Sequence, residues 1–247
     1  MTNDADRLTA LLNNIRYPAG ISPVHPGAIE RAAFFPGGTG MVIGNDPKTA
    51  MPGNNLPKGG TLVLGHHFGS VNSYDEVVNH GGEMDRQGTW PTLIRLLREC
   101  DIDLTECFFT NAFMGLMQTD SSLGSHKGHR DRDFRDDCKR VLTASIEMQQ
   151  PRLILVLGGP ARRFVGEVVE GLDAWRKNIS FPMFDEQRLS ESGLALRGPS
   201  GAPMSAVSLI HPSMRDCNVS SRQFGEFTGH YAEVEMVKCA KRACGLS

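Results

Sequence analysis

The sequence predicts a single α/β domain over its 247 residues. Four short apolar runs are each followed by a glycine or a polar residue, which is typical of buried strands that deliver side chains to one edge of a sheet. The clearest run, L-I-L-V-L at 153–157, leads through Gly-Gly-Pro at 158–160 into a helical pattern. Because a strand, a glycine-rich turn and a helix form a parallel crossover unit, we expect parallel strands. The chain is long enough for one large core.

Composition and charge narrow the class of protein. The net charge of −2 gives no overall basic field, so any DNA site must be a local patch. The six cysteines form no C-x-x-C pair, which argues against a metal centre or a disulfide framework. The first residues lack a cationic apolar leader, and no window approaches the roughly 18 apolar residues of a membrane span. We therefore expect a cytoplasmic protein with no membrane partner, metal or cofactor.

The first elements are predicted from apolar spacing and turn residues. Residues 4–16 place leucines and an isoleucine on one helical face, which indicates a packing helix. Residues 17–60 are rich in Pro and Gly, so turns dominate, with a short edge strand at 41–43. Residues 61–64 suit a strand buried on both faces, and Gly65 then opens a polar loop. This loop carries His66, His67, Ser70 and Asn72.

The middle of the chain repeats this pattern of strand and polar end. Residues 74–87 are polar and contain glycines, and residues 89–100 have the apolar stripe of a helix. The run C-F-F-T at 107–110 predicts a second strand that ends at Asn111. Residues 118–133 form a polar loop with several basic side chains. The remaining predictions are helices at 134–149, 161–169 and 220–243, a strand at 206–210, and a hairpin or irregular cover over 172–203.

The strand ends carry a recognisable set of residues. Gly65 follows the first strand, Asn111 follows F-T, and His211-Pro212-Ser213 follows the last strand. These motifs, in this order, resemble the uracil-DNA glycosylase superfamily, and the strand at 153–157 resembles an internal L-L-G strand of that family. The resemblance covers about residues 60–220. It implies a three-layer α/β/α sandwich with a central four-stranded parallel sheet.

The resemblance also implies roles for individual residues. Such enzymes extrude a base from the DNA stack and read its edge by hydrogen bonds. Asn111 matches the base-reading Asn, because an amide both donates and accepts. His211 matches the residue that donates to the base carbonyl as negative charge builds on the departing base. Ser213 matches a contact to the DNA backbone, and Met214 and Arg215 occupy the positions from which the family inserts a side chain into the vacated stack.

The first motif departs from the family pattern at the position that activates water. Active relatives carry Gly-x-Asp-Pro or Gly-x-Glu, whose carboxylate orients or deprotonates the attacking water. Here His67 stands at the carboxylate position, and a neutral imidazole can act as a base near pH 7. The nearest replacement carboxylates are Asp75 and Glu76. Some family branches with Asn or Ala at this position show slower or different substrate use, so the excised base stays open.

The base pocket is expected around the same motif. Gly65 and His66 would line it, and Phe68 or Tyr74 would supply the ring that stacks on the base. The small side chains of residues 69–82 would leave room for a modified base. An iron-sulfur branch of the family uses cysteines near the N-terminus, whereas no Cys precedes Cys100 here, so we expect a cluster-free branch.

Several of these residues have simpler interpretations. Lys127 and Arg130 could contact DNA phosphates, but interleaved aspartates make a solvated surface at least as good an interpretation. Arg162 and Arg163 follow a glycine pair at a helix start and could touch a phosphate or be ordinary exposed residues. His66 and His67 make a poor metal pair, since adjacent side chains in an extended chain point apart.

Three functions are compatible with the sequence. The first is a monomeric, monofunctional DNA glycosylase that hydrolyses the N-glycosidic bond of a uracil-type base or a modified pyrimidine. Foreign DNA is one source of such a base. The second is a protein of the same fold that binds DNA or a modified base without excision. The third is a nucleotide-binding or hydrolase protein, which ranks last because the sequence has neither a G-x-G-x-x-G nor a P-loop signature.

Overall fold

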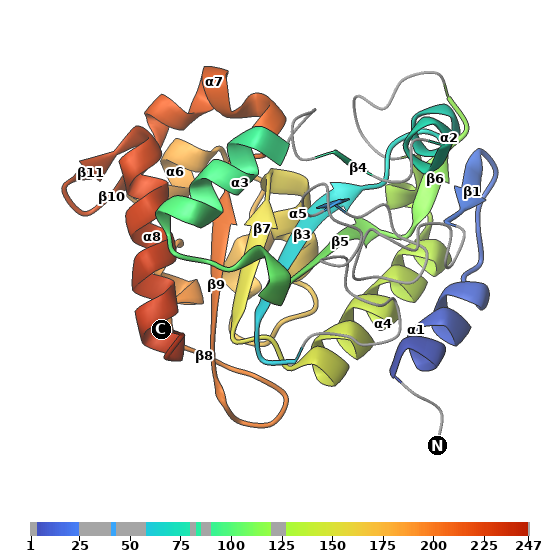
Figure 1. The fold of residues 1–247 in the computed structure, drawn as a ribbon, viewed down its shortest axis with the longest axis horizontal. Coiled ribbons are helices and arrows are strands. Elements are labelled where there is room, and N and C mark those ends of the chain that lie inside the picture. Colours follow the sequence, from blue (N-terminus) through green and yellow to red (C-terminus); the bar gives the residue numbers. More distant parts are fainter. Residues whose placement is uncertain are drawn as a thin grey trace.

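The protein is built around a five-stranded mixed sheet (Figure 1). The structure, a computed structural model, describes residues 4–24, 41–42, 58–79, 83–84, 90–119 and 127–246. The sheet has the order β5-β3-β7-β9-β8, with strands β3 (Thr61–His67), β5 (Cys107–Phe113), β7 (Leu153–Leu157), β8 (Leu196–Arg197) and β9 (Pro203–Leu209). The first four strands in this order are parallel neighbours, as predicted. The prediction of a wholly parallel, four-stranded sheet is incomplete, because β8 adds an antiparallel fifth strand.

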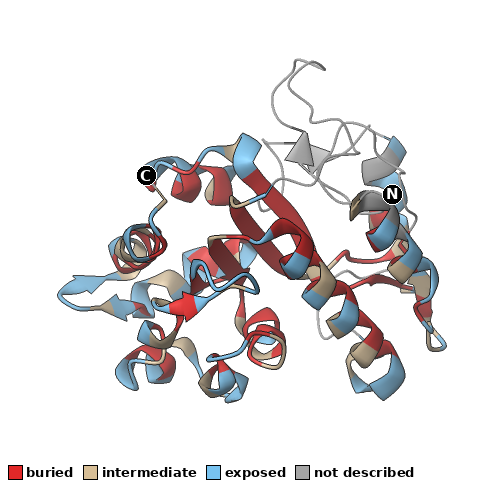
Figure 2. Cartoon of the chain, turned by 90° about the horizontal axis from the view of Figure 1, so that it is seen from below, coloured by how far each residue is buried: buried red, intermediate tan, exposed pale blue. Residues whose placement is uncertain are grey.

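Helices cover both faces of the sheet. In Figure 1, α3 (Trp90–Glu99) and α8 (Gly229–Cys244) lie in front of the strands, and α5 (Gly159–Val165) lies behind them. All five residues of β7 are buried, with Leu155 in register between Val63 and Val207. A strand buried on both faces needs the continuous apolar run that the sequence shows. Figure 2 shows the same division, with buried residues on the strands and exposed residues on the outward faces of the helices.

The N-terminal helix α1 (Asp4–Asn13) is tied to α4 (Arg132–Gln149). The backbone N–H of Arg16 donates to Asp137 Oδ2 at 2.9 Å, and its guanidinium Nε donates to the same oxygen at 3.1 Å. Two small sheets complete this side: β1 (Ile21–Pro23) pairs antiparallel with β6 (Gly115–Met117), and β2 (Met41–Val42) pairs parallel with β4 (Glu83–Met84). The predicted edge strand at 41–43 is confirmed over 41–42, and most of the predicted turn-rich segment lies outside the described residues.

The polar pattern after Gly65 predicts a loop and no helix before residue 89, whereas helix α2 (Val71–Asn79) forms there. Ser70 explains the start of this helix, because its Oγ accepts the N–H of Ser73 at 3.3 Å and supplies a cap. The first two core strands are also longer than predicted. Gly65 and Asn111 consequently lie within β3 and β5 and not in the loops that follow them.

The C-terminal half contains short elements that the apolar pattern did not resolve. The predicted irregular cover over 172–203 holds one short helix, two 3₁₀ turns and β8, and the predicted final helix starts later because a hairpin precedes it. The remaining elements are η1 (Leu104–Glu106), η2 (Lys127–Arg130), η3 (Asp173–Arg176), α6 (Phe181–Glu186), η4 (Glu191–Gly193), η5 (Pro212–Met214), α7 (Arg215–Asn218), η6 (Val219–Ser221), β10 (Gln223–Phe224) and β11 (Phe227–Thr228).

The strand order reverses between β3 and β7. After β3 the chain adds β5 on one side, and it then returns to add β7 and β9 on the other side. In open α/β sheets, ligands bind in the crevice at the carboxyl ends of the strands next to such a reversal. The fold therefore points to this edge of the sheet as the site. No helix in the described ranges is long and apolar enough to cross a membrane.

Candidate functional site at the carboxyl edge of the sheet

Gly65 and Asn111 are direct register partners on β3 and β5. A Cβ at Gly65 would lie only 2.3 Å from Asn111 Oδ1, so the amide of Asn111 occupies the space above Gly65. Asn111 is half-buried. The glycine that the sequence places at the end of the first apolar run thus has a specific use: its missing side chain makes room for the amide on the neighbouring strand.

A second pair forms where β7 and β9 end. Gly158 has a φ of +91°, a conformation that glycine adopts without strain. Its N–H donates to Leu209 O at 2.8 Å. A Cβ at Gly158 would lie 3.3 Å from the Cβ of His211. The turn after β7 therefore packs directly against the His-Pro-Ser loop. Gly65, Asn111, Gly158 and His211 all lie at the carboxyl edge of the four parallel strands.

The hydrogen bonds of His211 define its tautomer. His211 caps η5, and its Nδ1 accepts the backbone N–H of Ser213 at 3.3 Å and lies 2.7 Å from Ser213 Oγ. Because Nδ1 uses its lone pair for this N–H, the proton of the neutral ring sits on Nε2. Burial lowers the pKa of His211 below its ordinary value of 6.5. The ring is therefore a neutral Nε2–H donor at pH 7.

His67 is held in a similar way, with a different consequence. Its Nδ1 accepts the N–H of Gly69 at 3.0 Å, which again assigns the proton of the neutral ring to Nε2. A ring in this state donates a hydrogen bond and has no lone pair left to accept a proton from water. The described conformation therefore weighs against His67 as a base. Asp75, the other candidate, is exposed on α2.

The two predicted stacking rings are both buried in the hydrophobic core. Phe68 is 7% exposed and Tyr74 is 2% exposed. Burial, together with the charge of Asp75, raises the pKa of Tyr74 to about 12, so its hydroxyl stays protonated. Their placement is that of core residues, and the aromatic side chains that line a pocket at this edge are Phe113 and Phe164.

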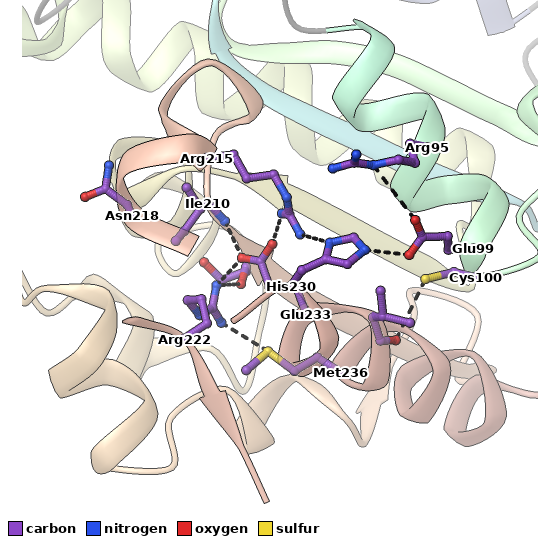
Figure 3. A network of polar contacts seen from close by, with 12 residues as sticks. Arg95, Glu99, Cys100, Ile210, Arg215, Asn218, Arg222, His230, Glu233 and Met236 are labelled. Carbon is purple, nitrogen blue, oxygen red and sulfur yellow. Dashed lines mark hydrogen bonds and ion pairs between the residues drawn. The ribbon is translucent and has the colours of Figure 1, made fainter. Parts of the chain in front are cut away.

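The His-Pro-Ser loop is clamped at both ends by one buried carboxylate (Figure 3). Glu233 of α8 accepts the N–H of Ile210, directly before His211, at 2.7 Å, and it forms an ion pair with Arg215, two residues after Ser213. Arg222 joins this group, because its Nη1 lies 2.7 Å from Glu233 Oε1 and its Nε lies 2.8 Å from Asp185 Oδ2. These carboxylate and guanidinium groups are almost completely buried. The loop is therefore fixed by packing and ion pairs from outside itself.

The three residues predicted to contact DNA after His211 differ in their placement. Ser213 is exposed, and Met214 is 55% exposed. Arg215 is 3% exposed, and its Nη2 lies 2.6 Å from Nδ1 of His230. The other ring nitrogen of His230, Nε2, lies 2.5 Å from Glu99 Oε2. A side chain inserted into DNA must be exposed, so the prediction for Arg215 needs correction: it anchors the loop. Met214 retains the exposed position that insertion requires.

A pocket of about 300 Å³ opens at the same edge of the sheet. It lies where the ends of β3 and β5 meet η2 and the first turns of α4 and α5. His66 directly follows Gly65 in the chain, and Pro160 follows Gly158 by two residues, so the pocket adjoins the two pairs described above. Its lining residues are His66, Phe113, His129, Arg135, Pro160, Arg163 and Phe164.

The pocket combines an aromatic wall with cationic groups. The ring of Phe113 lies 5.5 Å from that of His66 and 5.1 Å from that of Phe164. The two arginines come from different helices, Arg135 from α4 and Arg163 from α5. No acidic residue is among those that line the pocket. The arrangement is suited to a ligand that carries both a flat ring and a negative charge.

The sequence prediction identified only part of this pocket. His66 was predicted as a site residue, and Arg163 as a phosphate contact or an exposed residue. Lys127 and Arg130 of η2 are exposed, so either DNA contact or plain solvation suits their placement. Phe113 and Arg135 were missed, because each lies in a regular apolar or amphipathic pattern that also describes a core position. Only the meeting of separate elements reveals them.

Comparisons and metal geometry add no further assignment. Within the described part of the chain, no group of three or more His, Cys, Asp or Glu side chains is placed to hold a metal ion. No model of a known protein family matches the chain, and no curated protein matches it with significant similarity. The predicted resemblance to glycosylases therefore rests on the motifs of this chain alone.

Proposed function

We propose that the protein is a monofunctional DNA glycosylase of the uracil-DNA glycosylase type, acting on an extruded uracil-type base or a modified pyrimidine. The observation that carries this proposal is the pairing of Gly65 with Asn111 at the same sheet edge as a neutral, Nε2-protonated His211. The helices on both sides of four parallel strands correspond to the three-layer α/β/α arrangement that the resemblance implies. DNA is the proposed partner of a monomeric protein.

The strand order supports a grip on a single ring. Asn111 lies on β5 and His211 follows β9, three strand steps away in the sheet. At roughly 4.8 Å per step, this is a backbone separation of about 14 Å, which two inward-reaching side chains and one base can fill. Asn111 would read the edge of the base, and the Nε2–H of His211 would donate to the carbonyl that gains charge as the bond breaks.

The weak point in catalysis is the activation of water. Without a carboxylate at position 67, and with Nδ1 of His67 occupied by Gly69, the chain offers less base catalysis than Gly-x-Asp relatives. Catalysis would then depend mainly on stabilising the departing base, which His211 supplies. We therefore propose a slow enzyme whose preferred substrate has a good leaving group. Asp75 remains a candidate to orient water when DNA is bound.

The test is the release of free base from defined duplexes and from modified genomic DNA. Substrates should include uracil, a deaminated purine and pyrimidines with bulky 5-substituents, because the assay must not presuppose uracil. We expect Asn111→Ala and His211→Ala each to lower release by about 100-fold, since each removes a group that acts on the base. Asn14→Ala, which changes an exposed asparagine directly after α1, is the matched control and should match the wild type.

A second candidate function is DNA or base binding without excision. The state of His67 favours it, because a protein that only binds needs no base for water. Binding to a modified duplex that produces no free base from any substrate would support this alternative and contradict the glycosylase proposal. Binding that is lost in Asn111→Ala would still locate the site at this edge.

A further inference from the structure

We propose that the pocket formed by His66, Phe113, His129, Arg135, Arg163 and Phe164 binds a nucleoside monophosphate group, with the phosphate on the arginines and the base against the phenylalanines. The ligand is either a free mononucleotide or the phosphorylated end of a DNA strand, which present the same chemistry. The pocket shares His66 with the predicted base pocket, but nucleotide binding to it can be measured in the absence of any base release.

The charge of the lining selects an anion. Arg163 forms no ion pair with a carboxylate among the described residues. Its Nη1 lies close to Gly159 at the start of α5, 3.7 Å from the position that a Cβ would take there. Arg135 shares Glu167 with Lys139, so two cations face one carboxylate. A phosphomonoester carries about 1.5 to 2 negative charges at pH 7, which suits such a surplus of cations better than a singly charged diester does.

A buried arginine next to Arg163 adds to the positive charge of this region. Arg162 is fully buried, and burial together with the neighbouring charges of Arg163 and Arg222 lowers its pKa to about 10. A bound anion would offset this accumulation of positive charge.

Shape and directions favour a phosphate with an attached ring. Nitrogen-bearing side chains line the pocket from three elements, His129 from η2, Arg135 from α4 and Arg163 from α5, and an anion with several acceptor oxygens can use more than one of them. The tilted rings of Phe113 and Phe164 supply an apolar wall that inorganic phosphate alone would not use. A volume of about 300 Å³ is at the small end of ligand sites, which run from roughly 300 to 1,000 Å³. One nucleotide is therefore the largest ligand that we expect.

The experiment measures binding by calorimetry with the full chain at low salt. The probes are thymidine 5′-monophosphate, thymidine, inorganic phosphate, and a short oligonucleotide with or without a 5′-phosphate. We expect a phosphorylated probe to bind at least about tenfold more tightly than its unphosphorylated counterpart, because charge-assisted hydrogen bonds are lost without the phosphate. If thymidine 5′-monophosphate binds more tightly than thymidine, the ligand is a free mononucleotide. If the phosphate strengthens binding only of the oligonucleotide, the ligand is the phosphorylated end of a strand.

Variants connect the binding to the pocket. Arg163→Gln should lower the affinity for the phosphorylated probe about tenfold. Arg163→Lys should lower this affinity less, because lysine keeps the positive charge. The matched control is Arg197→Gln, an exposed arginine on β8 at the opposite edge of the sheet, which should bind like the wild type. Thermal unfolding of each variant checks that the fold is kept. Equal binding of phosphorylated and unphosphorylated probes, or unchanged binding by a folded Arg163→Gln, would overturn the proposal.

Discussion

His211 acts as a neutral hydrogen-bond donor only while its ring stays unprotonated. Its lowered pKa means that the folded protein binds this proton less readily than the unfolded chain does. The stability linked to His211 is therefore fully present above the unfolded value of about 6.5 and is lost as the pH falls through the folded pKa.

We expect an NMR titration of the His211 ring to have its midpoint below 6.5 and to show the Nε2–H tautomer at pH 7. The cause is burial of the ring together with the Ser213 N–H on Nδ1. A midpoint at or above 6.5, or a proton on Nδ1, would show that His211 is not a neutral Nε2–H donor at pH 7.

The missing side chain of Gly65 makes room for the amide of Asn111, so replacement of Gly65 should displace that amide. In Gly65→Ala the new Cβ would meet Asn111 Oδ1 at 2.3 Å, so the amide must move. We expect a loss of stability of about 1–3 kcal/mol. Base release or base binding should fall by about 100-fold, because a small displacement of a positioning group is enough to misalign the ligand.

Urea unfolding and the base-release assay measure the two effects of Gly65→Ala. Gly198→Ala is the matched control, since the nearest atom to its Cβ would be Ala202 O at 3.6 Å, an ordinary contact. If Gly65→Ala binds and releases base like the wild type, the amide of Asn111 is not the reading group. A loss of stability alone, with full function, would show the same.

At the scale of elements, the last helix fixes the loop that carries His211. Glu233 on α8 holds the backbone before the loop and the guanidinium after it, and it also pairs with Arg222. Removing one partner from a buried ion pair leaves an uncompensated buried charge. Glu233→Gln should therefore destabilise the protein by about 3–5 kcal/mol. It should also loosen the His-Pro-Ser loop, which hydrogen exchange at Ile210 would report.

Glu235→Gln provides the matched control on the same helix. Glu235 pairs with Arg242 near the surface, where an ion pair contributes less than about 1 kcal/mol. Both variants are compared by urea unfolding. Similar midpoints for Glu233→Gln and Glu235→Gln would show that the clamp contributes little, and the loop would then have to be held by its own capping bonds.

The sequence predicted elements best where a strong apolar pattern is bounded by turn residues. The strand at 153–157 is confirmed to the residue, and helix α3 matches its prediction within one residue at each end. Helix α2 was missed because V-N-S-Y-D-E is polar on most of its surface, so its pattern resembles a loop. Its cap comes from Ser70, which the chain itself places at the end of β3. Ser70 itself forms a β-bridge with Met117, so a contact with a distant segment fixes where the helix starts.

At the scale of the whole molecule, burial sets the reactivity of the six free thiols. Cys100, Cys107, Cys138 and Cys244 are buried, Cys239 is half-buried, and Cys217 is exposed. Burial raises the pKa of Cys100 and of Cys138 to about 12, which keeps both as unreactive thiols. We therefore expect one fast-reacting cysteine, Cys217, in the folded protein.

Labelling with a thiol reagent at pH 8 tests this, because the thiolate is the reactive form. Cys217→Ser should remove the fast phase, and all six cysteines of the wild type should react after unfolding in urea. Fast modification of a buried cysteine in folded protein would show that the core opens more readily than the packing indicates. Cys239→Ser is the control and should leave the fast phase unchanged.

Local residue patterns are enough to predict the class of fold, the four parallel strands and the polar residues near their carboxyl ends, because buried strands need continuous apolar runs and tight turns favour glycine. They also place Gly65, Asn111 and His211 at one edge of the sheet. The surroundings of these residues are visible only in the folded chain: the fifth strand, the burial of Arg215 and the pocket formed by Phe113 and Arg135. These depend on contacts between segments far apart in the chain, which local patterns of hydrophobicity do not encode.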